Sequence, residues 1–284
     1  MDGFIQTEIN PKLLHPNLNI DDLEEYPNKP GVYYFYNSED VLIYIGKSKH
    51  IRKRIEQHLI NHSTKKAVEM RNDIAKIKYQ LTGSELIALL KESQEIKEFR
   101  PKYNRAQKRI SYPMGLFSFT DQAGYKNLYI ERINQVDENP ITTFSTKNSA
   151  KPFLDNVISE FQLCQKLCGI SHGTTACFNY QIKNCKGACV KEENAEEYNL
   201  RVDAFVENHS LKDQLIFDKG RHFKERGFVY VKDGIYQGFG YIPYKEYKAG
   251  NYNLKKYTQK AEHNRDVQSI IKMMLRTNPK LEIV

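Results

Sequence analysis

The sequence lacks any long hydrophobic run. No stretch approaches the roughly 20 consecutive apolar residues that a membrane-spanning helix needs, and the N-terminus does not show the basic and then apolar pattern of a secretory signal peptide. We therefore expect a cytoplasmic protein that has no membrane partner. The 284 residues also contain no internal repeat and no low-complexity tract, and they are enough to bury one large or two small cores.

Cysteine is scarce and unevenly placed. The five cysteines are an odd number and all lie between Cys164 and Cys189, which fits metal binding better than the disulfide framework of a secreted protein. Cys168, Cys177, Cys185 and Cys189, which are separated by eight, seven and three residues, could surround a tetrahedral Zn²⁺ or a [4Fe-4S] cluster.

The ligand set of this cluster is open at the level of sequence. Cys164 lies four positions before Cys168 and is an alternative to it, and His172 is a weaker candidate. Buried free thiols that hold no metal are the other interpretation. Metal analysis and a visible spectrum separate these readings.

Acidic side chains are outnumbered. Lysine and arginine total 43 against 35 aspartate and glutamate residues, which gives a net charge of +8, and residues 26–109 alone hold 18 basic and 9 acidic side chains. A basic segment suits a polyanion, and the 19 tyrosines and 14 phenylalanines supply surfaces on which bases can stack. DNA or RNA is therefore the leading partner, against the alternative of a soluble surface that happens to be basic.

Residues 31–54 bring aromatic and basic side chains close together. Gly31-Val32-Tyr33 and Tyr44-Ile45-Gly46-Lys47 flank a turn-forming stretch at 37–40, which predicts a β-hairpin that places Tyr33 near Tyr44. Gly46 allows a sharp turn, and a helix follows in which Arg54 and His58 lie one turn apart. We expect Arg54 and His58 to point at one ligand.

A leucine-rich helix is predicted from Ser84 to about Phe99, after a helix at about 65–76 and a short strand at 77–81. Glu92 lies at the edge of its apolar stripe. It is either an edge charge paired with a neighbouring lysine or a carboxylate placed as a ligand. Arg100-Pro101 ends the helix, and Asn104 follows in a loop.

Several short motifs resemble those of a known nuclease family. Gly31-Val32-Tyr33 and Tyr44-Ile45-Gly46 resemble the two signature triplets of the GIY-YIG nuclease superfamily, with valine in place of isoleucine. The wider set resembles the nuclease domain of UvrC, the incision subunit of excision repair; it comprises Gly46-Lys47-Ser48-Lys49, Arg54, Glu92 and Arg100-Pro101-Lys102-Tyr103-Asn104.

The resemblance continues into the cysteine-rich region. Ala176-Cys177-Phe178, Cys185-Lys186-Gly187-Ala188-Cys189 and Glu196-Glu197-Tyr198 are similar to the cysteine-rich segment of UvrC. The later regions of UvrC do not follow, so the chain resembles the shorter Cho-type homologues. Residues 14–104 also resemble the GIY-YIG half of bacterial proteins that fuse it to an exonuclease.

The resemblance implies roles for the site residues. Glu92 would hold one Mg²⁺ or Mn²⁺, and either Tyr33 or Tyr44 would be the general base. Lys47 and Arg54 would favour the phenolate, and Arg54 would also clamp the scissile phosphate. His58 stands where UvrC often has tyrosine, and it would bond a phosphate or cap the helix face. Asn104 would orient Glu92 or a backbone group.

The implied function is a metal-dependent, structure- or lesion-specific DNA endonuclease of nucleotide excision repair. Its expected partners are DNA and the damage-recognition proteins of excision repair, and the resemblance favours an iron–sulfur cluster over zinc at the cysteines. Two alternatives are a catalytically idle, metal-stabilised DNA-binding adaptor and a restriction or phage-defence nuclease.

The expected fold class is α+β, with further hairpins at about 112–133 and 228–241 and helices at about 149–163, 192–209 and 265–276. The predicted divisions are a leader (1–25), a GIY-YIG nuclease domain with an antiparallel sheet flanked by helices (26–109), a hairpin with a connecting helix (110–163), a cysteine-rich region (164–200) and a small α+β C-terminal region of unknown role (201–284).

Overall fold

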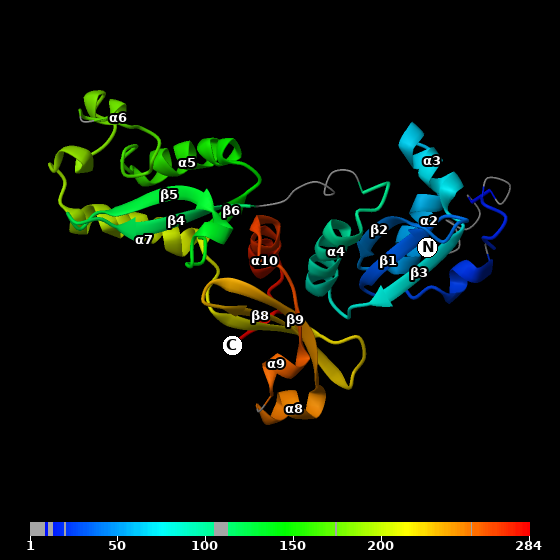
Figure 1. Ribbon diagram of the computed structural model, residues 1–284. Helices are drawn as coiled ribbons and strands as arrows, with labels where there is room; N and C mark the ends of the chain where they lie inside the picture. Colours follow the sequence, from blue (N-terminus) through cyan, green and yellow to red (C-terminus); the bar gives the residue numbers. More distant parts are fainter. Residues whose placement is uncertain (1–8, 11–13, 20, 105–112, 174, 251) are drawn as a thin grey trace.

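The computed structural model describes residues 9–10, 14–19, 21–104, 113–173, 175–250 and 252–284, and it confirms the α+β class. Three antiparallel sheets follow one another along the described part of the chain, and helices pack against each (Figure 1). Within these residues every helix is too short or too polar to cross a membrane.

The first sheet has the strand order β2-β1-β3, built from β1 (Gly31–Tyr36), β2 (Leu42–Ser48) and β3 (Lys76–Leu81). The predicted hairpin is confirmed, because Tyr33 pairs with Gly46 across β1 and β2. The flanking helices are α2 (Ile51–Ile60), α3 (Lys65–Asp73) and α4 (Glu85–Phe99). The helix expected at 65–76 ends three residues early, since β3 begins at Lys76.

The two faces of this sheet belong to different helices. Val32 and Ile45 pack with Ile96 of α4, whereas Tyr33 and Phe35 pack in a cluster that includes α2. The stretch expected as a leader joins the second cluster. Leu23, which lies in the short 3-10 helix η2 (Asp21–Glu25), is buried there, and so is Ile9.

Strand β2 lies at the edge of the sheet, and side chains and a loop cover its outer backbone groups. Asn104 accepts a hydrogen bond from the Ile45 amide (2.9 Å) and donates to the Ile45 carbonyl (2.7 Å). The Tyr103 amide donates to the Ile43 carbonyl (2.9 Å). These bonds satisfy groups that an open edge would leave to solvent or to another chain.

The second sheet has the order β5-β4-β6, with β4 (Met114–Thr120), β5 (Lys126–Arg132) and β6 (Thr142–Phe144). It packs in one apolar core with α5 (Lys147–Phe161) and α7 (Ala195–His209). The shorter elements of this region are η3 (Ile133–Gln135), α6 (Phe178–Gln181) and η4 (Ala188–Val190). Three cysteines belong to the same core, at positions 164, 168 and 177.

The third sheet has the order β10-β9-β8-β7-β11. Its strands are β7 (Gln214–Lys219), β8 (Glu225–Lys232), β9 (Ile235–Pro243), β10 (Thr258–Lys260) and β11 (Glu282–Ile283). Its helices are α8 (Tyr244–Ala249), α9 (Leu254–Tyr257) and α10 (Arg265–Thr277). The predicted turn at Asp233-Gly234 and the terminal helix are confirmed, while β7, β10 and β11 were not predicted.

Helix α4 is shared between the first and third sheets. Its Leu86, Ile87 and Leu90 are buried with residues of the C-terminal core, such as Val229 and Ile271. Positions 86, 87 and 90 lie on the opposite side of the helix from 92 and 96, because successive residues are rotated by about 100°. One helix therefore closes two cores (Figure 1).

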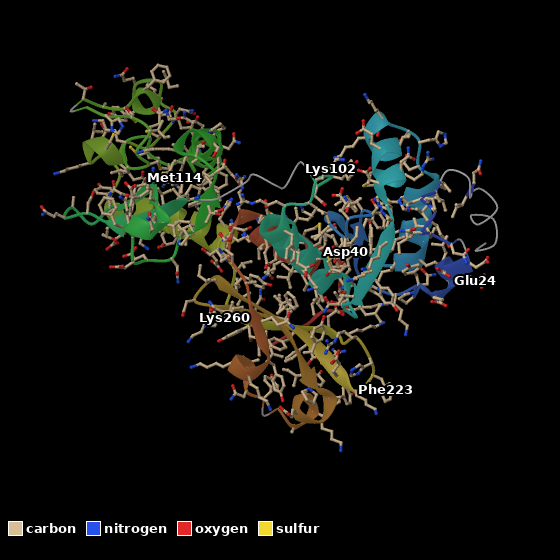
Figure 2. All side chains as sticks on the ribbon, turned by 45° about the vertical axis from the view of Figure 1, so that its right-hand side comes forward. Glu24, Asp40, Lys102, Met114, Phe223 and Lys260 are labelled. Atoms are coloured by element: carbon tan, nitrogen blue, oxygen red, sulfur yellow. The ribbon has the colours of Figure 1, made fainter. Side chains whose placement is uncertain are left out.

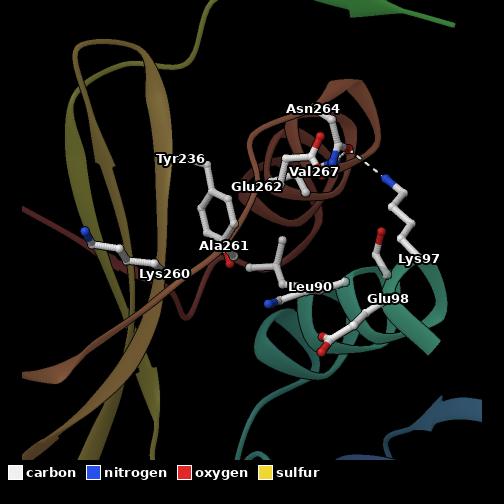
Figure 3. Close-up of a pocket in the computed structure, with 11 residues that line it drawn as sticks. Leu90, Lys97, Glu98, Tyr236, Lys260, Ala261, Glu262, Asn264 and Val267 are labelled. Atoms are coloured by element: carbon white, nitrogen blue, oxygen red, sulfur yellow. Dashed lines mark hydrogen bonds between the residues drawn. The ribbon is translucent and has the colours of Figure 1, made fainter. Parts of the chain in front are cut away.

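A cavity of about 460 Å³ lies on the side of α4 that faces the C-terminal sheet and α10 (Figure 3). Leu90 of α4, Tyr236 of β9 and Val267 of α10 line it, and the Lys97 ammonium donates to the Asn264 side chain at 3.0 Å across it. This cavity faces away from Glu92. It marks the junction of two parts of the chain and is distinct from the group of residues that the sequence identified.

Candidate active site and cysteine cluster

The two tyrosines of the hairpin meet on the face of the first sheet that packs against α2. Tyr33 is 1% exposed, its ring centroid lies 6.1 Å from that of Tyr44, and its hydroxyl lies 2.8 Å from Nε2 of His58. Tyr44 is half-buried. Tyr44 is therefore the most accessible of these three residues, while Tyr33 and His58 are buried.

Gly46 makes this approach possible. A Cβ atom at this position would lie 2.2 Å from the Tyr33 hydroxyl oxygen, 2.4 Å from Cζ of the same ring and 2.8 Å from Cε1 of Tyr44. Such distances are far inside van der Waals contact. The phenol of Tyr33 thus lies directly over the Gly46 backbone, which only a residue without a side chain permits.

The electrostatics separate the two phenols. Burial, with Tyr44 as a smaller contributor, raises the pKa of Tyr33 well above its ordinary value of 10, and Arg54 opposes the rise. Burial also raises the pKa of Tyr44, where the Tyr33 hydroxyl lowers it, the Glu92 carboxylate raises it and Arg54 lowers it. The Tyr33 hydroxyl thus opposes the rise at Tyr44, whereas Tyr44 adds to the rise at Tyr33.

The predicted convergence of Arg54 and His58 takes a different form from that expected. Arg54 is exposed on α2 and acts on both phenols, whereas His58 is 9% exposed and bonded to Tyr33. Burial, and then the Arg54 charge, lower the pKa of His58 to about 4. The imidazole is therefore neutral near pH 7 and faces Tyr33 instead of a phosphate.

Glu92 reaches the same place from α4. Its Oε1 accepts a hydrogen bond from the Lys47 amide at 2.9 Å, so the carboxylate lies at the end of β2, one residue beyond Gly46. Burial raises the pKa of Glu92, and the Lys47 amide, the Lys47 ammonium and Arg54 lower it. The Glu92 carboxylate therefore bonds to the Lys47 backbone on β2. This contact differs from the edge-charge interpretation, in which Glu92 would pair with the side chain of a neighbouring lysine.

Lys47 and Asn104 act through contacts that the sequence did not specify. The Lys47 ammonium pairs with Glu85 at 3.0 Å, and Lys49 pairs with the same carboxylate at 2.7 Å. Lys47 was expected to favour the phenolate, but the cation that lowers the pKa of both tyrosines is Arg54. Of the two roles expected for Asn104, the structure places it on a backbone group, the peptide of Ile45.

Glu85 was missed by the sequence analysis. It is the first residue of α4 after the Ser84 N-cap, and its position indicated only a helix start. Its partners lie 36 and 38 positions earlier, so no local pattern could have linked them.

The cysteines form a cluster whose membership differs from the prediction. The Sγ atoms of Cys164, Cys177 and Cys189 all lie within 4.8 Å of one another. Cys185 adjoins this group, because its thiol and that of Cys177 act on each other through a hydrogen bond. Two of the four predicted ligands, Cys177 and Cys189, are therefore in the group, and a third, Cys185, adjoins it.

Cys168 is the exception and is replaced by Cys164. Its thiol is turned into the core, where its Sγ lies 4.0 Å from the Tyr198 hydroxyl. Burial raises the pKa of Cys168 to about 12, as expected for a thiol in an apolar setting. The fully buried Tyr198 is the neighbour of the Cys168 thiol, which lies outside the group of mutually close thiols.

Two protein families match successive parts of the sequence. Residues 29–105 match the UvrC-like GIY-YIG domain, and residues 116–208 match the middle domain of the UvrC/Cho excinucleases. The chain thus carries a UvrC-like GIY-YIG domain followed by a UvrC/Cho middle domain. The paired tyrosines, Arg54 and Glu92 thus lie in its nuclease domain, and the cysteine cluster lies in its middle domain. Both matches end before the third sheet begins at Gln214.

Individual relatives are about one third identical to this chain over the residues that align. UvrABC system protein C of Clostridium tetani is 32% identical over 205 residues, which are 69% of this chain and 32% of the relative. Excinuclease cho of Salmonella typhi is 33% identical over 193 residues, which are 65% of this chain and 63% of the relative. The matched stretch thus spans about a third of the UvrC relative and less than two thirds of the Cho relative.

Among solved structures, the GIY-YIG N-terminal endonuclease domain of UvrC from Thermotoga maritima, bound to magnesium as its catalytic divalent cation, is 32% identical to this chain. That similarity covers 34% of this chain and 98% of the solved domain, with a TM-score of 0.28.

Proposed function

We propose that the chain is a metal-dependent endonuclease that hydrolyses a phosphodiester bond of damaged or branched DNA in nucleotide excision repair. The observation that carries this proposal is the convergence of Tyr33, Tyr44, Arg54 and Glu92 around Gly46. The similarity to these relatives supports the reaction class, since they are excision-repair nucleases by name. DNA and the damage-recognition proteins of excision repair are the proposed partners.

The residues present fit one hard divalent cation. Glu92 is a partly buried carboxylate whose Oε1 is fixed by the Lys47 amide, and its charge acts on Tyr44, so the two groups are neighbours. Carboxylate oxygen is a preferred ligand of Mg²⁺ and Mn²⁺, which complete their shell with water and phosphate oxygens. When bound there, the ion would neutralise charge that develops on the phosphate.

Tyr44 is the proposed general base, with Tyr33 and His58 as a relay behind it. The attacking water gives a proton to the Tyr44 oxygen, Tyr44 passes its own proton to Tyr33, and Tyr33 passes its proton to Nε2 of His58. Neutral His58, whose Nε2 lies 2.8 Å from the Tyr33 hydroxyl, holds the proton in passing; because its pKa is lowered to about 4, it returns that proton through the tyrosines to solvent after the P–O3′ bond breaks. The hydroxide forms the new bond to phosphorus, the P–O3′ bond breaks, and O3′ takes a proton from solvent.

The relay removes a difficulty of phenol bases. An unperturbed phenol titrates near 10, and burial raises the pKa of both tyrosines further. Concerted transfer to His58 leaves neither oxygen as a free phenolate. Arg54, exposed and close to both phenols, is the proposed clamp for the scissile phosphate, through two parallel hydrogen bonds.

The shape of the site supports a polymeric substrate. Tyr44 belongs to the edge strand β2 and Arg54 is exposed on α2, and neither the cavity at α4 nor a second cavity of about 440 Å³ is lined by Tyr44, Arg54 or Glu92. An extended strand can cross such an edge without being enclosed. The basic residues of the nuclease domain supply the attraction for its phosphates.

For the cysteines we propose a metal centre held by Cys164, Cys177, Cys185 and Cys189. The sequence resemblance favours [4Fe-4S], and Zn²⁺ is the alternative. The mutual approach of the thiols within one core supports binding of either group. The centre would hold the middle region together.

The decisive experiment compares Glu92→Ala with Glu98→Ala, an exposed glutamate on the same helix, in nicking assays with Mg²⁺ or Mn²⁺. Substrates are lesion-bearing, flapped and plain duplexes. We expect the wild type and Glu98→Ala to nick lesion-bearing or flapped DNA, and Glu92→Ala to bind DNA without nicking. Full activity of Glu92→Ala would refute the site. A wild type that binds and never nicks would support an idle adaptor, and sequence-specific cutting of plain duplex would support a restriction nuclease.

A further inference from the structure

The loop between β7 and β8 combines positive charge with an exposed aromatic ring. Phe223 at its tip is 85% exposed (Figure 2). From Lys219 to Arg226 the chain carries four lysine or arginine side chains and one carboxylate, that of Glu225. This loop belongs to the C-terminal sheet and lies outside both family matches.

The loop is held in one shape from within. Glu225, which is 8% exposed, accepts hydrogen bonds from the backbone amide, Nε and Nη2 of Arg221 at 2.8, 2.8 and 2.9 Å. The Arg221 guanidinium lies 4.1 Å from the centre of the Tyr241 ring, and the Tyr241 hydroxyl donates to the carbonyl of Thr82 at 3.2 Å. Phe223 is therefore presented on a rigid support that is tied to the nuclease domain.

A groove of about 440 Å³ joins this loop to the nuclease domain. Residues of both parts line it, among them Lys29, Leu81, Lys219, His222 and Phe223. It adjoins the start of β1, where Gly31 pairs with Ser48. Two residues of strand span roughly 7 Å, so the groove begins within about one nucleotide of Tyr33 and of the Lys47 to Lys49 segment.

We propose that this groove and loop bind the DNA strand that continues from the scissile phosphate, with Phe223 stacked on an unpaired base. The inference rests on the proposed function, because it takes the nuclease substrate as the ligand. The cations of the groove match a phosphate backbone, and an exposed ring offers a sequence-tolerant surface for a base. A protein partner would need a wider apolar patch than one ring set among cations.

The chain contains no tryptophan, which gives a direct test. Phe223→Trp places a single fluorophore at the proposed stacking position, and Phe119→Trp places one at an exposed phenylalanine of β4 as the matched control. With full-length protein, EDTA and a duplex that contains an unpaired bubble, we expect the emission of Phe223→Trp to be quenched and to saturate together with DNA binding followed by anisotropy. Unchanged emission at saturating DNA would overturn the proposal.

Two further variants separate stacking from charge. Phe223→Ala should weaken binding of bubbled DNA by about tenfold and binding of plain duplex less, while Phe119→Ala leaves both unchanged. Lys224→Ala should lower the slope of log K against log salt by about one. If Phe223→Ala binds bubbled DNA as the wild type does, the loop serves a different partner and the proposal fails.

The binding assays are independent of cleavage, because EDTA removes the divalent cation. If the wild type does not nick DNA but the emission of Phe223→Trp is quenched, the proposed function is contradicted and the proposal that the loop contacts DNA still holds. A wild type that nicks while Phe223→Trp is not quenched would contradict only the loop.

Discussion

The hydroxyl of Tyr33 lies 2.8 Å from Nε2 of His58, inside the core of the nuclease sheet. Because burial and Arg54 lower the pKa of His58 to about 4, the imidazole is neutral near pH 7, and its Nε2 shares a hydrogen bond with the Tyr33 hydroxyl. His58, which the sequence predicted beside Arg54, therefore lies behind the tyrosines. It gives the buried hydroxyl a partner, and in the proposed mechanism it receives the proton.

The first prediction concerns the proton relay. His58→Gln keeps an acceptor for the Tyr33 hydroxyl but cannot take up the proton, so we expect the nicking rate to fall by about 100-fold while DNA binding is unchanged. Single-turnover nicking and anisotropy measure the two effects. A rate for His58→Gln within threefold of wild type, roughly, would show that the relay does not operate.

The second prediction is the pH dependence of stability. The folded-state pKa of His58 is about 4, below its ordinary 6.5, so the unfolded state takes up the proton first as the pH falls. The contribution of His58 to the free energy of unfolding is fully present above pH 6.5 and is lost as the pH falls towards 4, by about 3 kcal/mol. Urea unfolding at pH 7.5 and 4.5 should show a smaller loss for His58→Gln than for the wild type. Equal losses would contradict the assignment.

The third prediction concerns the close approach at Gly46. Gly46→Ala would place Cβ 2.2 Å from the Tyr33 hydroxyl, so the ring must shift away from Tyr44 and His58. We expect nicking to fall by at least about 100-fold and the free energy of unfolding to fall by about 1–3 kcal/mol. Gly124→Ala is the control, because it strains a positive φ of 86° but meets only Ala195 at 3.7 Å. It should lower stability without a comparable loss of rate.

The fourth prediction distinguishes the two upstream cysteines. Cys164 lies in the cluster and Cys168 does not, although both are buried. Cys164→Ser should lose the bound metal and the visible absorption of anaerobically purified protein if the centre is [4Fe-4S], or the zinc if it is Zn²⁺. Cys168→Ser should retain full metal content. Loss of the centre in Cys168→Ser alone would reverse the assignment, and a folded, colourless, metal-free wild type would refute both.

The sequence predicted the nuclease hairpin and α4 well, because their signals are local. Alternating apolar residues around a turn determine β1 and β2, and Ser84 caps α4 in the structure as expected. The packing that positions the site is long-range and had no such signal. Lys47 and Glu85 are 38 positions apart, and the choice between Cys164 and Cys168 depends on where Tyr198 packs.

The C-terminal region was the least predictable part. Strand β7 has the sequence Gln-Leu-Ile-Phe-Asp-Lys, in which three apolar residues adjoin instead of alternating, and β11 has only two residues. Both become strands because neighbouring strands pair with them. The N-terminal residues Ile9 and Leu23 show no periodicity either, yet the nuclease core buries both.

The first two turns of helix α4 contain no exposed residue. Leu86, Ile87 and Leu90 are covered by the C-terminal sheet and α10, while Glu92 and Ile96 face the nuclease sheet. A fragment cut after Asn104 would expose these apolar residues on the helix that carries Glu92, and such a fragment should self-associate in solution. The C-terminal sheet thus covers the apolar surface of the same helix that places Glu92 in the proposed active site.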